Sequence, residues 1–273
     1  MTHAARGRLP ADLGARVAVA VPAAAVLVAA VHLGGLALAL PLALLGFLAQ
    51  RELAALAGVR GTPALPGALA VALAPLCVLG LEGSALAGAA ALGAAFATGA
   101  AAALAGAGRR RRAALASACG LAWIGVTLGH GVALRELDHG AALVIAVLLA
   151  TFLGDTAAQL VGTAFGRRKL APAISPNKTV EGLAAGILGG TAAGAAFLVL
   201  FHGDWIDAGA AVALGLAAAL AAPAGDLFES ALKRRAGVKD SGRLFGAHGG
   251  ALDRMDAALA AVTAGFYVAL AVA

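Results

Sequence analysis

Charged side chains concentrate in one stretch near the C-terminus, residues 225–256, of a chain that is otherwise mostly apolar. Both signs of charge alternate there at close range: the stretch holds Asp226, Glu229, Asp240, Asp253 and Asp256 together with Lys233, Arg234, Arg235, Lys239, Arg243 and Arg254. Polar groups at membrane depth must be paired or hydrated, so this density has a cost unless the groups do chemistry. We therefore expect a catalytic loop that acts on phosphates; the alternative is a solvated loop between two helices.

The polar residues of this stretch recur at helical spacing. One face of a helix that leaves the membrane carries Asp226, Glu229, Ser230 and Lys233. Asp253 and Asp256 share a face of the helix that re-enters it. Carboxylates from two helices supply the hard oxygen ligands that Mg²⁺ uses together with substrate phosphates. Gly249-Gly250 lets backbone approach a ligand closely, and His248 is either a phosphate donor or a structural loop histidine.

A second polar block runs from Asp155 to Gly182. Asp155 follows an apolar run, and an intramembrane carboxylate is a functional candidate by default. Further on, Ser175-Pro176-Asn177-Lys178-Thr179 precedes a new apolar segment. Pro176 predicts an extended turn, and Ser175 or Thr179 is expected to cap the following helix. A helix N-terminus beside Lys178 is suited to holding an anion; plain capping is the alternative, but it does not account for the lysine.

The elements that position these blocks are membrane helices. The chain has 273 residues, of which 62% are hydrophobic and 12% charged, whereas soluble domains carry roughly 25% charged residues. Long continuous apolar runs favour helices over a barrel. The sequence predicts an all-α integral membrane protein with about nine spanning segments, at residues 16–33, 34–50, 64–81, 84–106, 113–134, 140–154, 182–201, 207–225 and 255–273.

The basic residues alternate between successive loops. With the N-terminus in the cytoplasm, all of the 20 Lys and Arg residues except Arg135 lie in cytoplasmic loops. This topology accounts for the net charge of +6 without a nucleic-acid partner, and it places both polar blocks on the cytoplasmic side. We expect one continuous membrane domain, with N-terminal helices over 1–112 and a catalytic region over 113–273. The N-terminal half offers no predicted chemistry.

Four short motifs carry a family resemblance. They are Ser230-Ala231-Leu232-Lys233-Arg234, Lys239-Asp240-Ser241-Gly242, His248-Gly249-Gly250 and Leu252-Asp253-Arg254-Met255-Asp256. Together they resemble the signature of phosphatidate cytidylyltransferase, also called CDP-diacylglycerol synthase. Residues 175–182 resemble a second block of the same family, so the motifs cover roughly the C-terminal 120 residues.

The resemblance implies a multi-pass, dimeric enzyme of the inner membrane. It would join CTP and phosphatidate to give CDP-diacylglycerol and pyrophosphate, with Mg²⁺ and with K⁺ at a second metal position. By resemblance Asp226 and Asp253 bind metal. Catalytic roles in orienting that metal or offsetting charge on pyrophosphate fall to Asp240, Asp256, Lys233, Lys239 and Arg254. Substrate binding falls to Asp155, Ser175, Asn177, Lys178, Thr179, Ser230, Arg234, Ser241, His248, Gly249 and Gly250.

Some positions depart from the family pattern, and some functions stay open. Gly246-Ala247 stands where Pro-Gly is usual, Gln159 where Tyr is common, and Ala257 where Ser is common. A CTP-dependent enzyme on another lipid phosphate, or a polyprenol kinase, would use similar carboxylates. A transporter would place its carboxylates at a midplane pathway, whereas all of them except Asp155 are expected at cytoplasmic helix ends. A structural scaffold would not need this set of carboxylates.

Overall fold

The computed structural model describes residues 13–80, 106–242, 244 and 249–272. Its helices are α1 (Leu13–Leu33), α2 (Gly35–Leu56), η1 (Thr62–Ala64), α3 (Leu65–Gly80), α5 (Gly108–Gly120), the π-helical turn η2 (Leu121–Gly125), α6 (Val126–Glu136), α7 (Gly140–Phe165), α8 (Val180–His202), α9 (Ala208–Arg235) and α10 (Leu252–Val272). Two short strands, β1 (Lys169–Ala171) and β2 (Ser175–Thr179), form an antiparallel hairpin between α7 and α8. The prediction of a helical protein with membrane-length apolar helices is confirmed. The hairpin was not predicted.

Six helices in the described part of the chain are long and apolar enough to cross a membrane. They cover Gly35–Leu56, Gly108–Glu136, Gly140–Phe165, Val180–His202, Ala208–Arg235 and Leu252–Val272. The predicted spans 16–33 and 64–81 fall on α1 and α3, which contain shorter apolar stretches. The predicted span 84–106 lies outside the described residues, apart from its last position. The count of nine and the orientation therefore stay predictions.

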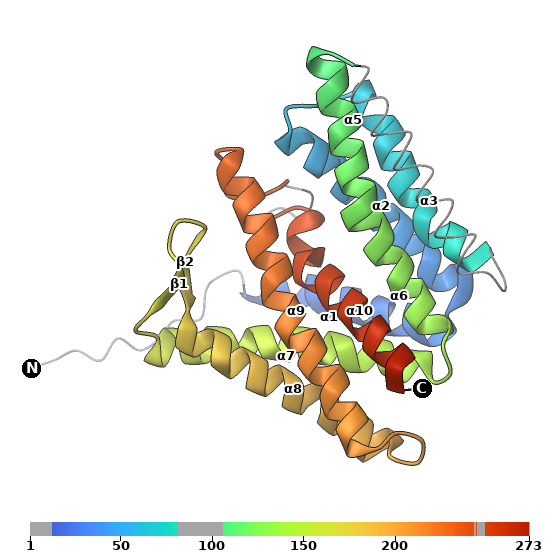
Figure 1. Ribbon diagram of the computed structural model, residues 1–273, viewed down its shortest axis with the longest axis vertical. Helices are drawn as coiled ribbons and strands as arrows, with labels where there is room; N and C mark the ends of the chain where they lie inside the picture. Colours follow the sequence, from blue (N-terminus) through green and yellow to red (C-terminus); the bar gives the residue numbers. More distant parts are fainter. Residues whose placement is uncertain (1–12, 81–105, 243, 245–248, 273) are drawn as a thin grey trace, which may run out of the picture.

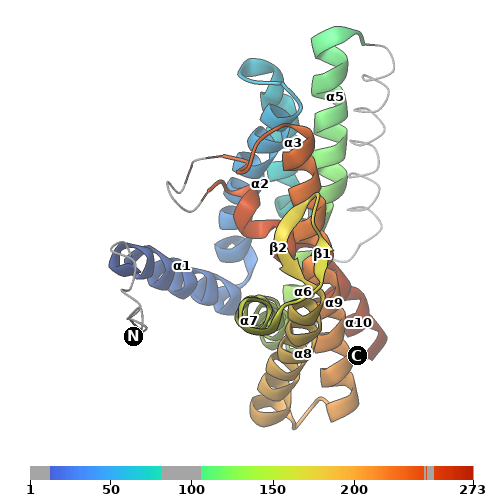
Figure 2. The same ribbon diagram turned by 90° about the vertical axis from the view of Figure 1, so that its left-hand side faces the viewer.

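The helices pack as two groups, which Figure 1 separates clearly. The N-terminal group contains α2, α3 and the continuous helix α5–η2–α6; the C-terminal group contains α7, α8, α9 and α10. Figure 2 shows α1 extending sideways from these helices. Helix α10 joins the groups, because Met255 and Leu259 enter one apolar core with α2 and α3 while Ala257 and Ala261 enter another with α7 and α9. The predicted boundary at residues 112 and 113 falls inside α5.

Small residues let α7 and α8 approach closely. Glycines recur every four residues along α8, at Gly182, Gly186, Gly190 and Gly194. A Cβ atom at Gly190 would lie 2.4 Å from the carbonyl oxygen of Ala150 on α7. Such spacing of small residues is typical of close helix pairs in lipid. It fixes α7, and with it the polar residues of its second half, against the start of α8.

The hairpin precedes α8 and is anchored at its base. Thr179 is the N-cap of α8, and its hydroxyl accepts a 3.1 Å hydrogen bond from the backbone N–H of Gly182. Of the two residues predicted as alternative caps, Thr179 is therefore confirmed, whereas Ser175 is in β2, well before the helix begins. Pro176 also belongs to this strand, where a proline is tolerated in a two-stranded sheet that is all edge.

Candidate active site

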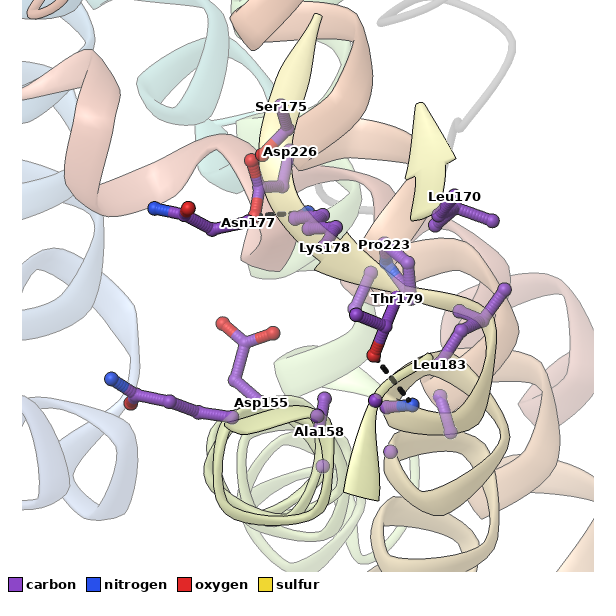
Figure 3. Close-up of a pocket in the computed structure, with 18 of the residues that line it drawn as sticks. Asp155, Ala158, Leu170, Ser175, Asn177, Lys178, Thr179, Leu183, Pro223 and Asp226 are labelled. Atoms are coloured by element: carbon purple, nitrogen blue, oxygen red, sulfur yellow. Dashed lines mark hydrogen bonds and ion pairs between the residues drawn. The ribbon is translucent and has the colours of Figure 1, made fainter. Parts of the chain in front are cut away.

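A cavity of about 680 Å³ opens between α7, α8, α9 and the hairpin. Figure 3 shows the side chains that line it. Most of its polar lining comes from both polar blocks of the sequence, including Asp155 and Gln159 from α7, Ser175, Asn177, Lys178 and Thr179 from β2, and Asp226 from α9. The volume falls in the range of about 300–1,000 Å³ that is usual for small-molecule sites. The fold thus brings together two blocks that are separated in the sequence by α8 and most of α9.

An ion pair between Lys178 and Asp226 joins the two blocks. The Lys178 Nζ atom lies 2.5 Å from Asp226 Oδ2, and the two side chains are 26% and 25% exposed. Ser230, one turn further along α9, donates its hydroxyl to Asp226 Oδ1 at 3.2 Å. In Figure 3, Asp155 rises from α7 toward the side of the cavity where this pair lies. The pair remains accessible to solutes, so the lysine can exchange its carboxylate partner for a phosphate.

Lys233 forms a second cluster, more deeply buried, between α9 and α10. It is ion-paired with Glu229, which is fully buried. Its Nζ atom also lies 2.7 Å from Asp253 Oδ1, and the two side chains are 12% and 9% exposed. Lys233 therefore links the face of α9 that the sequence predicted to Asp253 in the first turn of α10, a pairing that the helical spacing did not specify.

Backbone N–H groups complete the surroundings of Asp253. Ser241 N donates to Asp253 Oδ2 at 3.0 Å, and Gly250 N donates to the same oxygen at 2.7 Å. Gly249 has a φ of 81°, and a Cβ atom on it would lie 2.7 Å from Asp253 Oδ2. Only glycine accommodates both conditions. The expected close approach of backbone at the glycine pair is therefore made to Asp253 itself.

The remaining predicted site residues lie around these two clusters. Arg234 donates to the carbonyl oxygens of Ile174 and Val238, both at 3.1 Å, and so ties the hairpin to α9. Lys239 and Asp240 are exposed after α9. Asp256 accepts a 2.8 Å hydrogen bond from the N–H of Ala257. Arg254 is exposed and lines a second, apolar cavity of about 480 Å³. His248 and Gly246-Ala247 lie outside the described residues.

One residue of the site was missed. Glu52 on α2 accepts hydrogen bonds from Ser241, Ala251 and Leu252. The prediction that the N-terminal half offers no chemistry is therefore too broad, because this half contributes a carboxylate that holds the motif region. Glu52 follows Arg51 and resembles an ordinary charged helix end. The sequence feature that could have indicated the contact is in the motif region, where Gly242 and Gly250 leave room for the Glu52 side chain.

The donor set suits Mg²⁺ in type. Among the residues that the structure describes, no three His, Cys, Asp or Glu side chains gather closely enough to hold a metal ion by themselves. Asp226 and Asp253 are each paired with an ammonium group instead. Mg²⁺ usually binds one or two carboxylates together with substrate phosphates and water. These carboxylates therefore fit a metal that arrives with a phosphate ligand.

Comparisons with known proteins agree with the motifs. The phosphatidate cytidylyltransferase of Haemophilus influenzae is 40% identical over 129 residues, which are 45% of this chain and 44% of that protein. The phosphatidate cytidylyltransferase of Mycobacterium tuberculosis is 36% identical over 149 residues, which are 54% of this chain and 44% of that protein. Its Staphylococcus aureus counterpart is 41% identical over 122 residues, 44% and 45% of the two chains. Each match spans less than half the length of the relative.

The family model reaches further than these pairwise matches. A model described as the cytidylyltransferase family matches residues 14–272, nearly the whole chain and both helical groups. The chain belongs to the cytidylyltransferase family.

Proposed function

We propose that this protein transfers the cytidylyl group of CTP to phosphatidate, giving CDP-diacylglycerol and pyrophosphate. Relatives named phosphatidate cytidylyltransferase support this assignment. The observation that carries it is the meeting of Lys178, from the polar block at residues 155–182, with Asp226, from the polar stretch at residues 225–256, at one solute-accessible cavity beside α7. An anion-binding lysine and a carboxylate in contact are what a phosphate with a bound cation would separate and occupy.

The reaction makes one bond and breaks one. A phosphate oxygen of phosphatidate attacks the α-phosphorus of CTP, and the bond from that phosphorus to the oxygen of the β-phosphate breaks. Pyrophosphate leaves with the bonding electrons. The attacking phosphate is already ionised, so no strong general base is required. Catalysis then depends on holding the two anions together and offsetting their charge.

The chain's own residues supply both requirements. Lys178 and Asn177 of β2 hold a substrate phosphate in the cavity, with Asp155 on the facing helix. Lys233 offsets charge on the departing pyrophosphate from beside Asp253, and Lys239 and Arg254 act with it from the exposed segment after α9 and the start of α10. Asp226 and Asp253 are the carboxylates that would hold Mg²⁺, with K⁺ as the second cation, while Asp240 and Asp256 orient them. A bound Mg²⁺ ion would supply neutralisation of phosphoryl charge.

The test is formation of a labelled lipid by the purified protein. With radiolabelled CTP, phosphatidate and Mg²⁺, we expect label to enter the lipid phase, and EDTA or Asp226→Asn to abolish it. Asp138→Asn, an exposed aspartate between α6 and α7, is the matched control and should behave as wild type. No labelled lipid from the wild-type protein would overturn the proposal. Label on a polyprenol but not on phosphatidate would reassign the acceptor.

Location and assembly complete the proposal. The protein has helices long and apolar enough to cross a membrane, and we place it in the inner membrane with the cavity facing the cytoplasm, as a homodimer. The distribution of basic residues supports this orientation. Lys239 is exposed. In a Lys239→Cys variant, a membrane-impermeant thiol reagent should label residue 239 only after right-side-out vesicles have been opened. Labelling of right-side-out, sealed vesicles would reverse the orientation, and a single-chain mass in detergent would contradict the dimer.

A further inference from the structure

Glu52, in the N-terminal group, contacts the motif region directly. It lies in the last turns of α2 and is partly buried. Its Oε2 atom accepts the Ser241 hydroxyl at 2.8 Å and the Leu252 N–H at 2.9 Å. Its Oε1 atom accepts the Ala251 N–H at 3.0 Å. One carboxylate thus joins the segment after α9 to the start of α10.

Glycines on either side of this carboxylate leave room for it. A Cβ atom at Gly242 would lie 2.2 Å from Glu52 Oε1, and one at Gly250 would lie 2.3 Å from Glu52 Oε2. Neither position has space for another residue while Glu52 stays in place. Two glycines of the motif region, one in the Lys239–Gly242 motif and one in the His248–Gly250 motif, therefore lie against a side chain from α2, and a larger residue at either position would displace the Glu52 carboxylate.

The residues that Glu52 holds are adjacent to those that hold Asp253. Ser241 gives its hydroxyl to Glu52 and its backbone N–H to Asp253. Gly250 gives its N–H to Asp253, and the next two N–H groups go to Glu52. Residue 241 and residues 250–252 are therefore both held between two carboxylates, those of Glu52 and Asp253. Any movement of Glu52 therefore changes the donors that fix the orientation of Asp253.

We propose that Glu52 is a positioning residue for Asp253, acting through Ser241 and the backbone of residues 250–252. The carboxylate accepts hydrogen bonds from the N–H groups of Ala251, just before α10, and Leu252, its first residue. N–H groups at a helix start have no partners within the helix, and the negative charge of Glu52 is favourable at that helix end. The proposal rests on the proposed function for its catalytic consequence. The contact itself does not depend on which substrate binds.

The first test is Glu52→Gln. An amide has one acceptor oxygen, and its NH₂ group would face N–H or O–H donors, so at least one of the three contacts is lost. We expect kcat to fall and the half-saturating Mg²⁺ concentration to rise about 10- to 100-fold, the usual range when a partner of a metal ligand is removed. The KM for phosphatidate should not change. Glu136→Gln, an exposed glutamate at the end of α6, is the matched control.

The second readout needs no substrate or metal. Hydrogen exchange at the amides of Ala251 and Leu252 should be faster in Glu52→Gln than in wild type, with the exchange of α7 and α8 unchanged. Ser241→Ala, which removes one donor and leaves α2 intact, should show a smaller change in the same direction. This variant keeps the proposal testable if Glu52→Gln does not insert and fold.

The outcomes separate the two proposals. Wild-type exchange and wild-type kinetics in Glu52→Gln would overturn the role of Glu52. A fall in kcat with an unchanged Mg²⁺ dependence would also overturn it, because the effect would not pass through Asp253. A wild-type protein that forms no CDP-diacylglycerol, but whose Glu52→Gln variant exchanges faster at Ala251 and Leu252, would overturn the proposed function and still support the contact.

Discussion

The N-terminal and C-terminal helical groups both contain helices long and apolar enough to cross a membrane, and they accommodate buried polar groups differently. In the described part of the N-terminal group, Gln50 is a fully buried polar side chain, and its Nε2 donates to the Ala116 carbonyl at 2.9 Å. In the C-terminal group, buried and half-buried charges form ion pairs, at Lys178–Asp226 and at Lys233 with Glu229 and Asp253. One group uses hydrogen bonds to stabilise packing, and the other holds charges in pairs that a ligand can rearrange.

The contrast teaches where function can reside in an apolar protein. A neutral amide bound to a carbonyl stabilises two helices and offers nothing further. A buried lysine–carboxylate pair adds little to stability, because removing both charges from water costs free energy. It does, however, present a positive charge to a phosphate and a negative charge to the cation that the phosphate carries. Glu52 is the exception in the N-terminal group, since its partners belong to the catalytic motifs.

The largest effect on activity is expected for Asp253→Asn, which tests whether the paired charges of the C-terminal group carry the function. The substitution removes the charge that Lys233, Ser241 N and Gly250 N all contact. We expect kcat to fall by roughly 10³-fold or more, because electrostatic stabilisation of a phosphoryl group is lost. Initial rates of lipid labelling measure this, with Asp204→Asn, in the exposed loop before α9, as the control. A fall of less than tenfold would remove Asp253 from the catalytic centre.

A smaller effect is expected for Lys178→Met. The variant loses a charge-assisted contact to a substrate phosphate, which contributes about 1.5–3 kcal/mol, so the KM for one substrate should rise roughly 10- to 100-fold. Steady-state kinetics with CTP and phosphatidate varied separately will identify which phosphate Lys178 holds. The exposed Arg60→Met change is the matched control. Unchanged KM values for both substrates would show that the ion pair with Asp226 is structural.

The smallest effect on activity is expected for a substitution in the N-terminal group. Gln50→Ala removes the donor to Ala116 and leaves a space beside Gly120, where a Cβ atom would lie 1.5 Å from Gln50 Oε1. We expect a destabilisation of about 1–3 kcal/mol, seen as a lower unfolding temperature in detergent. The kcat of the folded protein should equal that of wild type. A large loss of kcat at full folding would mean that the N-terminal group does more than support the site.

The sequence by itself determined the class of the protein, most helix positions and the motif residues. Apolar length, helical spacing and the residue types of a motif are local properties, so α9 continues to Arg235 and carries Asp226 and Lys233 on one face as the spacing predicted. Only the tertiary structure decided which lysine meets which carboxylate, that residues 175–179 form a strand, and that Glu52 holds the start of α10. These contacts join segments up to 200 residues apart. They depend on how the helices pack, which no local pattern specifies.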